Sequence, residues 1–185
     1  PHTLPPPPRQ YFHTPPARPF SIVVPALSPF RFRSFSPLNQ LCLLPLRIDT
    51  KIPSVESLSL PPIIPTLAIT KRVIIIFVGA TGTGKSTSLA AMIGYRNQNS
   101  TGHIITIEDP IEFVHKHEGC IITQREVGID TDSWDAALKN TLRQAPDVIM
   151  IGEVRTREGM DHAIAFAETG HLVLVTVPAN TRSEQ

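Results

Sequence analysis

Residues 79–86 read Gly-Ala-Thr-Gly-Thr-Gly-Lys-Ser, and they directly follow the apolar run 73–78. A buried strand, a glycine-rich loop and a helix-forming stretch, in this order, are typical of a phosphate-binding loop. Gly79 and Gly84 allow the backbone to curl, so that successive N–H groups point inward at phosphate oxygens. The stretch therefore predicts a protein that binds a nucleoside triphosphate.

The end of the loop supplies the other groups that such a site needs. A helix that begins near Lys85 directs its positive N-terminal end at the phosphates. Lys85 can reach the β- and γ-phosphates, and the Ser86 hydroxyl can ligate Mg²⁺. We therefore expect ATP and Mg²⁺ as ligands, bound by Gly79, Ala80, Thr81, Gly82, Thr83, Gly84, Lys85, Ser86 and Thr87.

The composition limits the other classes of protein that the chain could be. Its 185 residues give room for one domain, and a formal charge of +1 favours neither nucleic acid nor acidic lipid. The two cysteines, Cys42 and Cys120, lie far apart, which argues against a zinc cluster or a disulfide framework. No apolar stretch approaches the roughly 20 residues that span a bilayer.

Proline divides the chain into unequal parts. Residues 1–45 hold 12 of the 19 prolines, no glycine and no acidic residue. This density breaks helices and strand ladders, so we expect 1–47 to be a Pro-rich, disordered segment. A ligand for an aromatic-lined groove is the rival interpretation of this segment. Residues 48–72 are expected to be a linker with one short helix, and 73–185 to form the folded domain.

Apolar strands alternate with amphipathic helices after residue 72. This alternation predicts an α/β fold with a mostly parallel sheet, whose ligands lie at the carboxyl ends of the strands. The expected strands cover 73–78, 103–107, 120–123, 147–151 and 172–177, and the expected helices cover about 85–97, 132 or 133 to 144, and 157–169.

Carboxylates follow two of the expected strands. If strand 147–151 lies beside the phosphate-loop strand, Glu153 faces the metal ion, directly or through a water. The segment 107–112 offers a second set, from which a carboxylate could orient or deprotonate an attacking water. We expect Glu112 in this role, although the sequence does not show which of Glu108, Asp109 and Glu112 points inward.

Several other polar residues have simpler interpretations. His171 follows a helix stop, and it is either a hydrogen-bonded loop residue or a phosphate sensor. His115 and His117 lack an evident third metal ligand, and Trp134 is expected to pack on a helix. A further acidic cluster is expected to be solvated loop and helix-start charge: Glu126, Asp130, Asp132 and Asp135.

Four motifs in order resemble those of secretion and type IV pilus motor ATPases, the GspE/PilT family. They read GATGTGKS (79–86), IITIEDPIEFVH (104–115), TLRQAPDVIMIGEVR (141–155) and AETGHL (167–172). They are similar to the Walker A, Asp-box, Walker B and His-box motifs of that family. The amino-acid sequence in and between these motifs resembles the PilT/PilU-type retraction branch, and within it the PilU type, over about residues 48–182.

The resemblance implies a RecA-like ATPase domain with named site residues. Glu112 matches the catalytic glutamate of the Asp box, Glu153 the Walker B glutamate, and His171 the first histidine of the His box. It also implies a cytoplasmic hexamer, peripheral to the inner membrane. The implied partners are copies of the chain, a paralogous retraction ATPase and the pilus platform protein, with twitching motility as the outcome.

The chain departs from the family pattern in three places. The second His-box histidine is replaced by Pro178, the Walker B signature ends in Arg155-Thr156, and the matched region stops before the later strands of a RecA-like domain. We therefore expect a sheet that is incomplete at its C-terminal end, weak nucleotide binding and slow hydrolysis. The alternatives are a secretion or pilus-extension ATPase of the same superfamily, and a non-catalytic nucleotide-binding chain.

Overall fold

The computed structural model describes residues 20–22, 30–35, 42–47 and 51–179. The chain divides into two units, Pro1–Asp49 and Thr50–Gln185. The first contains an antiparallel sheet in which β2 (Phe30–Phe35) lies between β1 (Phe20–Ile22) and β3 (Cys42–Arg47).

These three strands differ from the disorder expected for residues 1–47. The run Phe30-Arg31-Phe32-Arg33 alternates apolar and charged residues, a pattern that favours a strand and that the proline density concealed. Pro45 lies in an edge strand, where proline is tolerated. The rest of that prediction lies outside the described residues.

The second unit is built on a parallel five-stranded sheet. Its strand order is β4-β8-β7-β5-β6, and each neighbouring pair is parallel. The strands are β4 (Val73–Gly79), β5 (Gly102–Glu108), β6 (Cys120–Glu126), β7 (Val148–Ile151) and β8 (Leu172–Pro178). This confirms the predicted α/β fold with a parallel sheet.

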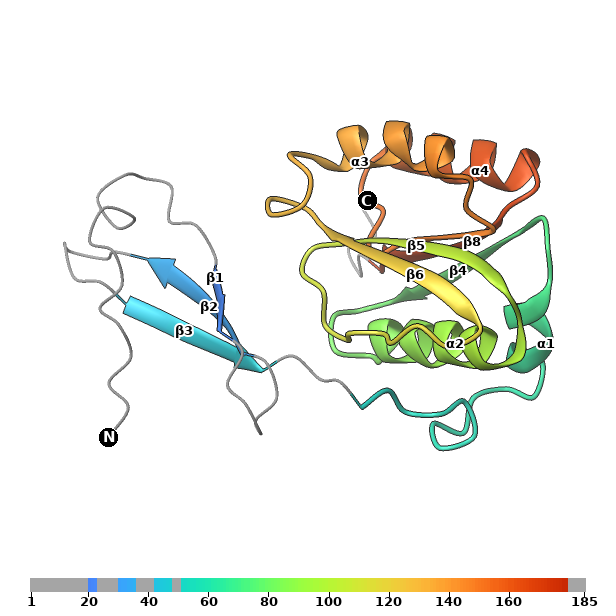
Figure 1. Cartoon of the computed structure of the whole chain (residues 1–185), viewed down its shortest axis with the longest axis horizontal. Helices are drawn as coiled ribbons and strands as arrows, with labels where there is room; N and C mark the ends of the chain where they lie inside the picture. The colour runs from blue at the N-terminus through green and yellow to red at the C-terminus, as the bar shows by residue number, and fades with distance from the viewer. Residues whose placement is uncertain (1–19, 23–29, 36–41, 48–50, 180–185) are drawn as a thin grey trace, which may run out of the picture. The chain divides into compact units, whose positions relative to one another are not determined.

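Helices cover both faces of this sheet (Figure 1). The helices are α1 (Ile64–Ile69), α2 (Lys85–Asn99), α3 (Trp134–Thr141), with the 3-10 turn Leu142–Gln144 after it, and α4 (Arg157–Glu168). Figure 1 shows α1 and α2 on one face and α3 and α4 on the other. Among the residues that the structure describes, no helix is both long and apolar enough to cross a membrane.

The side chains of the central strands alternate between two hydrophobic cores, as the period of a strand requires. In β7, Val148 and Met150 pack with α1 and α2, whereas Ile149 and Ile151 pack with α3 and α4. Trp134 is partly buried against the second core, as expected. The sheet thus lies between two layers of helices. The loops that follow the carboxyl ends of its strands are not covered by these helices and can form a site.

We predict that Ile149→Ala lowers the free energy of unfolding by about 2–5 kcal/mol, the usual cost of truncating a buried isoleucine to alanine. Ile149 is completely buried, so the truncation leaves a cavity in the core. Urea denaturation measures the change. Ile164→Ala is the matched control, because Ile164 is 43% exposed, and we expect it to change stability by less than about 1 kcal/mol.

Candidate functional site

The loop between β4 and α2 has the backbone conformations that glycine allows. Gly82 and Gly84 have φ angles of +81° and +87°, in the left-handed region. A Cβ atom at Gly79 would lie 2.7 Å from Thr83 Oγ1, so a side chain there would collide with the loop. The three glycines therefore allow the chain to reverse tightly between strand and helix.

The N-terminus of α2 suits an anion. Its N-cap residue is Gly84, which offers no capping side chain, whereas Ser133 and Thr156 cap α3 and α4 through their hydroxyls. The first N–H groups of α2 thus point out of the helix without a capping oxygen. Lys85 Nζ donates 2.8 Å hydrogen bonds to the carbonyl oxygens of Gly79 and Ala80, which hold the ammonium over the loop.

A cavity of about 380 Å³ opens beside this loop at the carboxyl edge of the sheet. Its lining includes basic and hydroxyl groups of the loop and α2 on one side, and carboxylates of other strand ends on the other. The polar lining residues are Thr81, Lys85, Ser86, Thr87, Glu108, Asp109, Glu112, His115, Glu153, Arg155 and Thr176. This donor set fits phosphate oxygens together with a divalent cation.

Glu153 reaches the cavity although β7 does not adjoin the phosphate-loop strand. The sequence interpretation required these strands to be neighbours, but β8 lies between them. Backbone hydrogen bonds beyond the strand end hold the segment in place: Gly152 N donates to Ile107 O (2.7 Å) and Val154 N to Thr176 O (2.8 Å). These bonds join the segment after β7 to β5 and β8, and they fix the backbone on both sides of Glu153.

Arg155 neutralises Glu153 within the cavity. Its Nη2 and Nε atoms lie 2.5 Å and 2.6 Å from Oε2 of Glu153. The arginine side chain is 76% exposed, so the bond to the carboxylate is easily exchanged with solvent or with a phosphate. Arg155 is thus a second cation, with Lys85, in the lining of the cavity.

Glu108 is a buried carboxylate that the sequence could not distinguish from its neighbours. Its Oε1 accepts hydrogen bonds from Thr106 Oγ1 (2.6 Å) and Gln124 Nε2 (3.1 Å). Burial, with smaller effects of Glu112 and Glu126, raises the pKa of Glu108, while the two hydrogen bonds oppose this shift. Glu108 therefore belongs to the wall of the cavity, whereas Asp109 and Glu112 are exposed carboxylates that follow it and line the same cavity.

Two side chains of β6 hold the loop that carries Glu112. Gln124 binds the backbone of Phe113 and His115, and Glu126 Oε2 accepts a hydrogen bond from Ile111 N at 3.0 Å. Glu126 is 4% exposed, so the expectation that it is solvated is wrong. Its position opposite Glu108 in the parallel register could not be read from the sequence, because the pairing of β5 with β6 was unknown.

The structure does not bring His171 to the cavity. His171 precedes β8, whose Leu172 pairs with Val73, whereas the loop follows the other end of β4. Six residues of strand separate the two ends, which is about 20 Å at 3.3 Å per residue. His171 Nδ1 lies 2.9 Å from Phe166 O and 3.1 Å from Thr169 Oγ1, so the hydrogen-bonded loop interpretation fits the structure.

Three of the nine predicted loop residues support the cavity without lining it. Gly79 and Ala80 accept the hydrogen bonds of Lys85, and Thr83 Oγ1 donates to Ala80 O at 2.8 Å. The other six line the cavity with Glu112 and Glu153.

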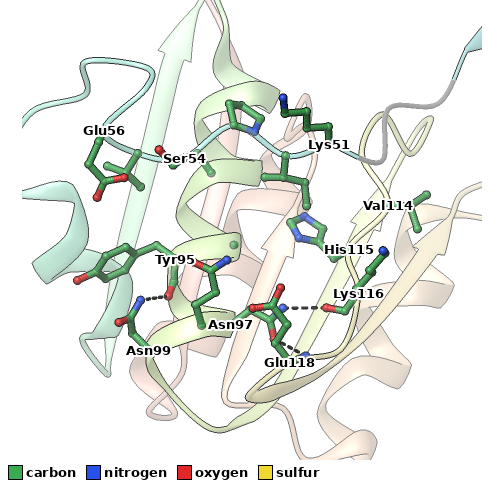
Figure 2. Close-up of a pocket in the computed structure, with 16 residues that line it drawn as sticks. Lys51, Ser54, Glu56, Tyr95, Asn97, Asn99, Val114, His115, Lys116 and Glu118 are labelled. Atoms are coloured by element: carbon green, nitrogen blue, oxygen red, sulfur yellow. Dashed lines mark hydrogen bonds between the residues drawn. The ribbon is translucent and has the colours of Figure 1, made fainter. Parts of the chain in front are cut away.

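A second cavity of about 380 Å³ has different chemistry (Figure 2). It lies between segment 51–56, the C-terminal half of α2 and segment 114–118. It contains neither the loop nor the carboxylates of the strand ends, and Figure 2 shows Lys51, Tyr95 and Asn99 around it. The site with phosphate-binding groups is therefore the cavity beside the loop.

His115 lines both cavities and is 9% exposed. Its Nδ1 is buried and has no hydrogen-bond partner among the described residues. Burial lowers the pKa of His115 from 6.5 to about 4. Because protonation is disfavoured in the folded state, His115 contributes stability above pH 6.5 that is lost as the pH falls toward 4.

We predict that the parent chain loses about 2 kcal/mol more stability between pH 7.5 and pH 5 than His115→Leu does, at 1.36 kcal/mol per pH unit below 6.5. Urea denaturation at the two pH values measures the difference. Equal losses in the two proteins would show that His115 is not held neutral by burial.

A family model, sequence relatives and a solved structure all match this chain and indicate the same family. A family model described as "Type II/IV secretion system protein" matches residues 63–185. The type IV pilus ATPase PilU of Pseudomonas aeruginosa is 66% identical over 165 residues, which are 89% of this chain and 43% of PilU. The retraction ATPase PilT of the same organism is 40% identical over 158 residues, 85% of this chain and 46% of PilT.

A solved structure agrees with the sequence matches. The pilus retraction motor PilT with bound ADP superimposes with a TM-score of 0.83 at 44% identity, over 88% of this chain and 47% of that one. The chain thus spans less than half the length of these relatives. Its phosphate loop, parallel sheet and matched sequence place it in one group: the chain belongs to the type II/IV secretion system protein family, as a member of its PilT/PilU type.

Proposed function

We propose that this chain carries the nucleotide site of a type IV pilus retraction ATPase of the PilU type. The observation that carries the proposal is one cavity that Lys85, Ser86, Glu112 and Glu153 line together. PilU and PilT are pilus ATPases by name, and the solved PilT holds ADP. The 66% identity to PilU, against 40% to PilT, favours the PilU type.

Each group has a distinct role in the proposed reaction. The amides that follow Gly82 and Gly84, together with Lys85, hold the phosphates, and the Ser86 hydroxyl with Glu153 holds Mg²⁺. Glu112 orients or deprotonates the water that attacks the γ-phosphate. Mg²⁺, when bound, neutralises charge on the phosphates. Arg155 is ion-paired with Glu153 Oε2, so it would compete with the cation for this carboxylate.

The assembly and its location follow from the resemblance to retraction motors. We propose a ring of six copies, or a mixed ring with a paralogous retraction ATPase, in the cytoplasm against the inner membrane. The pilus platform protein is the proposed recipient of force, and twitching motility the outcome. A neighbour in the ring would supply arginines that stabilise the transition state, an effect of about 10³–10⁵ in rate where an arginine finger has been measured.

Lys85→Ala should weaken the binding of Mg·ADP by about 10–100-fold, because a charge-assisted hydrogen bond contributes about 1.5–3 kcal/mol. A fluorescent ADP analogue measures the affinity. Lys71→Ala is the control, since Lys71 is an exposed lysine that does not line the cavity. Equal affinity of Lys85→Ala and the parent would exclude the loop as the phosphate site.

Glu112→Gln should keep the affinity for Mg·ADP within about 2-fold, yet lower ATP turnover by about 10²–10⁴, the usual contribution of a general base. Glu118→Gln replaces an exposed glutamate outside the cavity and should leave turnover unchanged. Phosphate release measures turnover. A Glu112→Gln protein that hydrolyses ATP as fast as the parent would refute the role of Glu112.

A further inference from the structure

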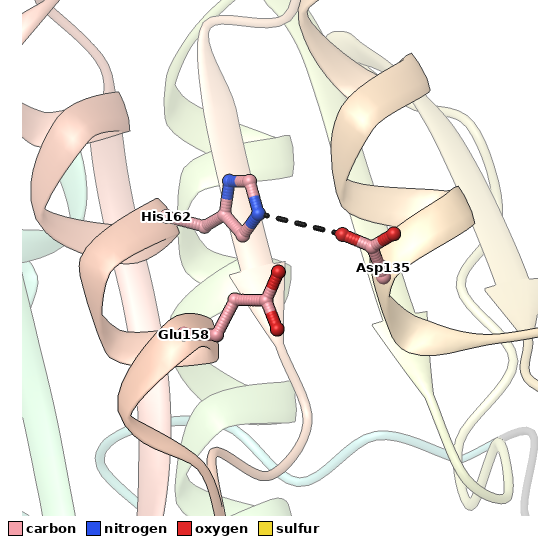
Figure 3. A group of neighbouring side chains, drawn as sticks. All are labelled: Asp135, Glu158 and His162. Atoms are coloured by element: carbon pink, nitrogen blue, oxygen red, sulfur yellow. Dashed lines mark ion pairs between the residues drawn. The ribbon is translucent and has the colours of Figure 1, made fainter.

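Three potential metal ligands from two helices meet on the face of the sheet that α3 and α4 cover. Asp135 lies in the first turn of α3, and Glu158 and His162 lie in α4. One ligand atom from each lies within 4.8 Å of the other two (Figure 3). None of the three lines the cavity beside the phosphate loop.

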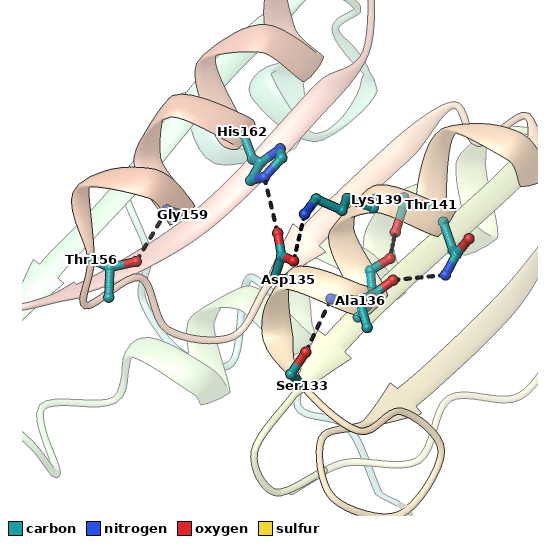
Figure 4. Close-up of polar contacts among 10 residues, drawn as sticks. Ser133, Asp135, Ala136, Lys139, Thr141, Thr156, Gly159 and His162 are labelled. Carbon is teal, nitrogen blue, oxygen red and sulfur yellow. Dashed lines mark hydrogen bonds and ion pairs between the residues drawn. The ribbon is translucent and has the colours of Figure 1, made fainter.

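The local structure explains why these side chains converge. Glu158 and His162 are four residues apart, so they project from the same face of α4. The starts of both helices are fixed by hydroxyl caps, Ser133 on Ala136 N and Thr156 on Gly159 N (Figure 4). The three ligands therefore come from the first two turns of capped helices.

Asp135 Oδ1 is the atom that the surrounding protein leaves without a hydrogen bond. This atom is shielded from solvent and no described residue donates a hydrogen bond to it, although the Asp135 side chain as a whole is 44% exposed. His162 Nε2 lies 3.7 Å away, too far for a hydrogen bond. Two metal–ligand bonds of about 2.1 Å span at most about 4.2 Å, so one cation can contact both atoms. Glu158 is exposed, so its carboxylate is able to rotate toward the same point.

We propose that Asp135, Glu158 and His162 form a binding site for a zinc-like divalent cation, separate from the magnesium of the nucleotide. One imidazole with two carboxylates is a donor set that Zn²⁺ accepts, whereas Mg²⁺ prefers oxygen ligands alone. Three protein ligands leave a fourth position for water. The bound cation would join α3 to α4, the helix that begins four residues after Glu153.

Lys139 limits the affinity of the proposed site. Its Nζ lies 2.7 Å from Asp135 Oδ2, the other oxygen of the carboxylate. An ammonium this close repels a divalent cation and competes for the same carboxylate. We therefore expect that substitution of Lys139 by a neutral residue strengthens metal binding.

A simple ion pair between Asp135 and His162 is the competing explanation. It needs a protonated imidazole, so it strengthens as the pH falls. A metal site needs a neutral imidazole, so its affinity falls as the pH falls. The two explanations thus predict opposite responses to acid, and only the metal site uses Glu158.

The test is calorimetric titration of Zn²⁺ into the full 185-residue chain, freed of metal by a chelator and without nucleotide, at pH 7.5. We expect one site in the parent, and an affinity at least about 10-fold weaker in Glu158→Gln and in His162→Gln. Glu168→Gln is the matched control, because Glu168 is an exposed glutamate near the other end of α4. Thermal unfolding without metal checks that each variant is folded. Because Glu158 is exposed, Glu158→Gln is less disruptive to folding than His162→Gln.

Two further titrations complete the test. Lys139→Gln should bind Zn²⁺ more tightly than the parent, and the parent should bind it more weakly at pH 5.5. The proposal is overturned if the parent binds no Zn²⁺. It is also overturned if Glu158→Gln binds as well as Glu168→Gln, because the metal then lies on other ligands.

Discussion

The reversal of the chain between β4 and α2 is the constraint on which the proposed site depends. Gly79, Gly82 and Gly84 allow it, through a close approach to Thr83 and two positive φ angles. The reversal leaves the N-terminus of α2 without a side-chain cap and brings the Lys85 ammonium onto two loop carbonyls. A side chain at any of these glycines would strain or block the loop. The affinity for phosphate therefore depends directly on the backbone geometry that these glycines allow.

The parallel sheet delivers the carboxylates to this loop. Because all five strands run the same way, Glu108 at the end of β5, and Glu112 and Glu153 beyond the ends of β5 and β7, lie on the same side of the sheet as the loop. Cross-strand hydrogen bonds from Gly152 and Val154 fix the segment of Glu153, and Gln124 fixes the backbone on either side of residue 114. The site is therefore assembled by backbone and amide contacts, which bring the charged groups of the loop and of the strand ends to one cavity.

Much of the fold and part of the site could be predicted from the sequence. The loop, the alternation of strands and helices, and the carboxylates Glu112 and Glu153 depend on local patterns. The structure has the expected loop and alternation, and both carboxylates line the cavity beside the loop. Strand order is not local: the sequence could not show that β8 separates β4 from β7. Because the sequence does not show which strands pair, it predicts Glu126 as a solvated surface charge and leaves open a phosphate-sensor role for His171. His171 lies about 20 Å from the loop, by the rise of strand β4.

The proposed site requires that nucleotide phosphates bind at the N-terminus of α2, in the cavity that Glu112 and Glu153 line. Crystals of the chain grown with Mg²⁺ and ADP test it most directly. We expect density for the β-phosphate on the amides of residues 82–87, with a metal ion between Ser86 and Glu153. A nucleotide found instead in the cavity beside residues 51–56, with the loop empty, would contradict it.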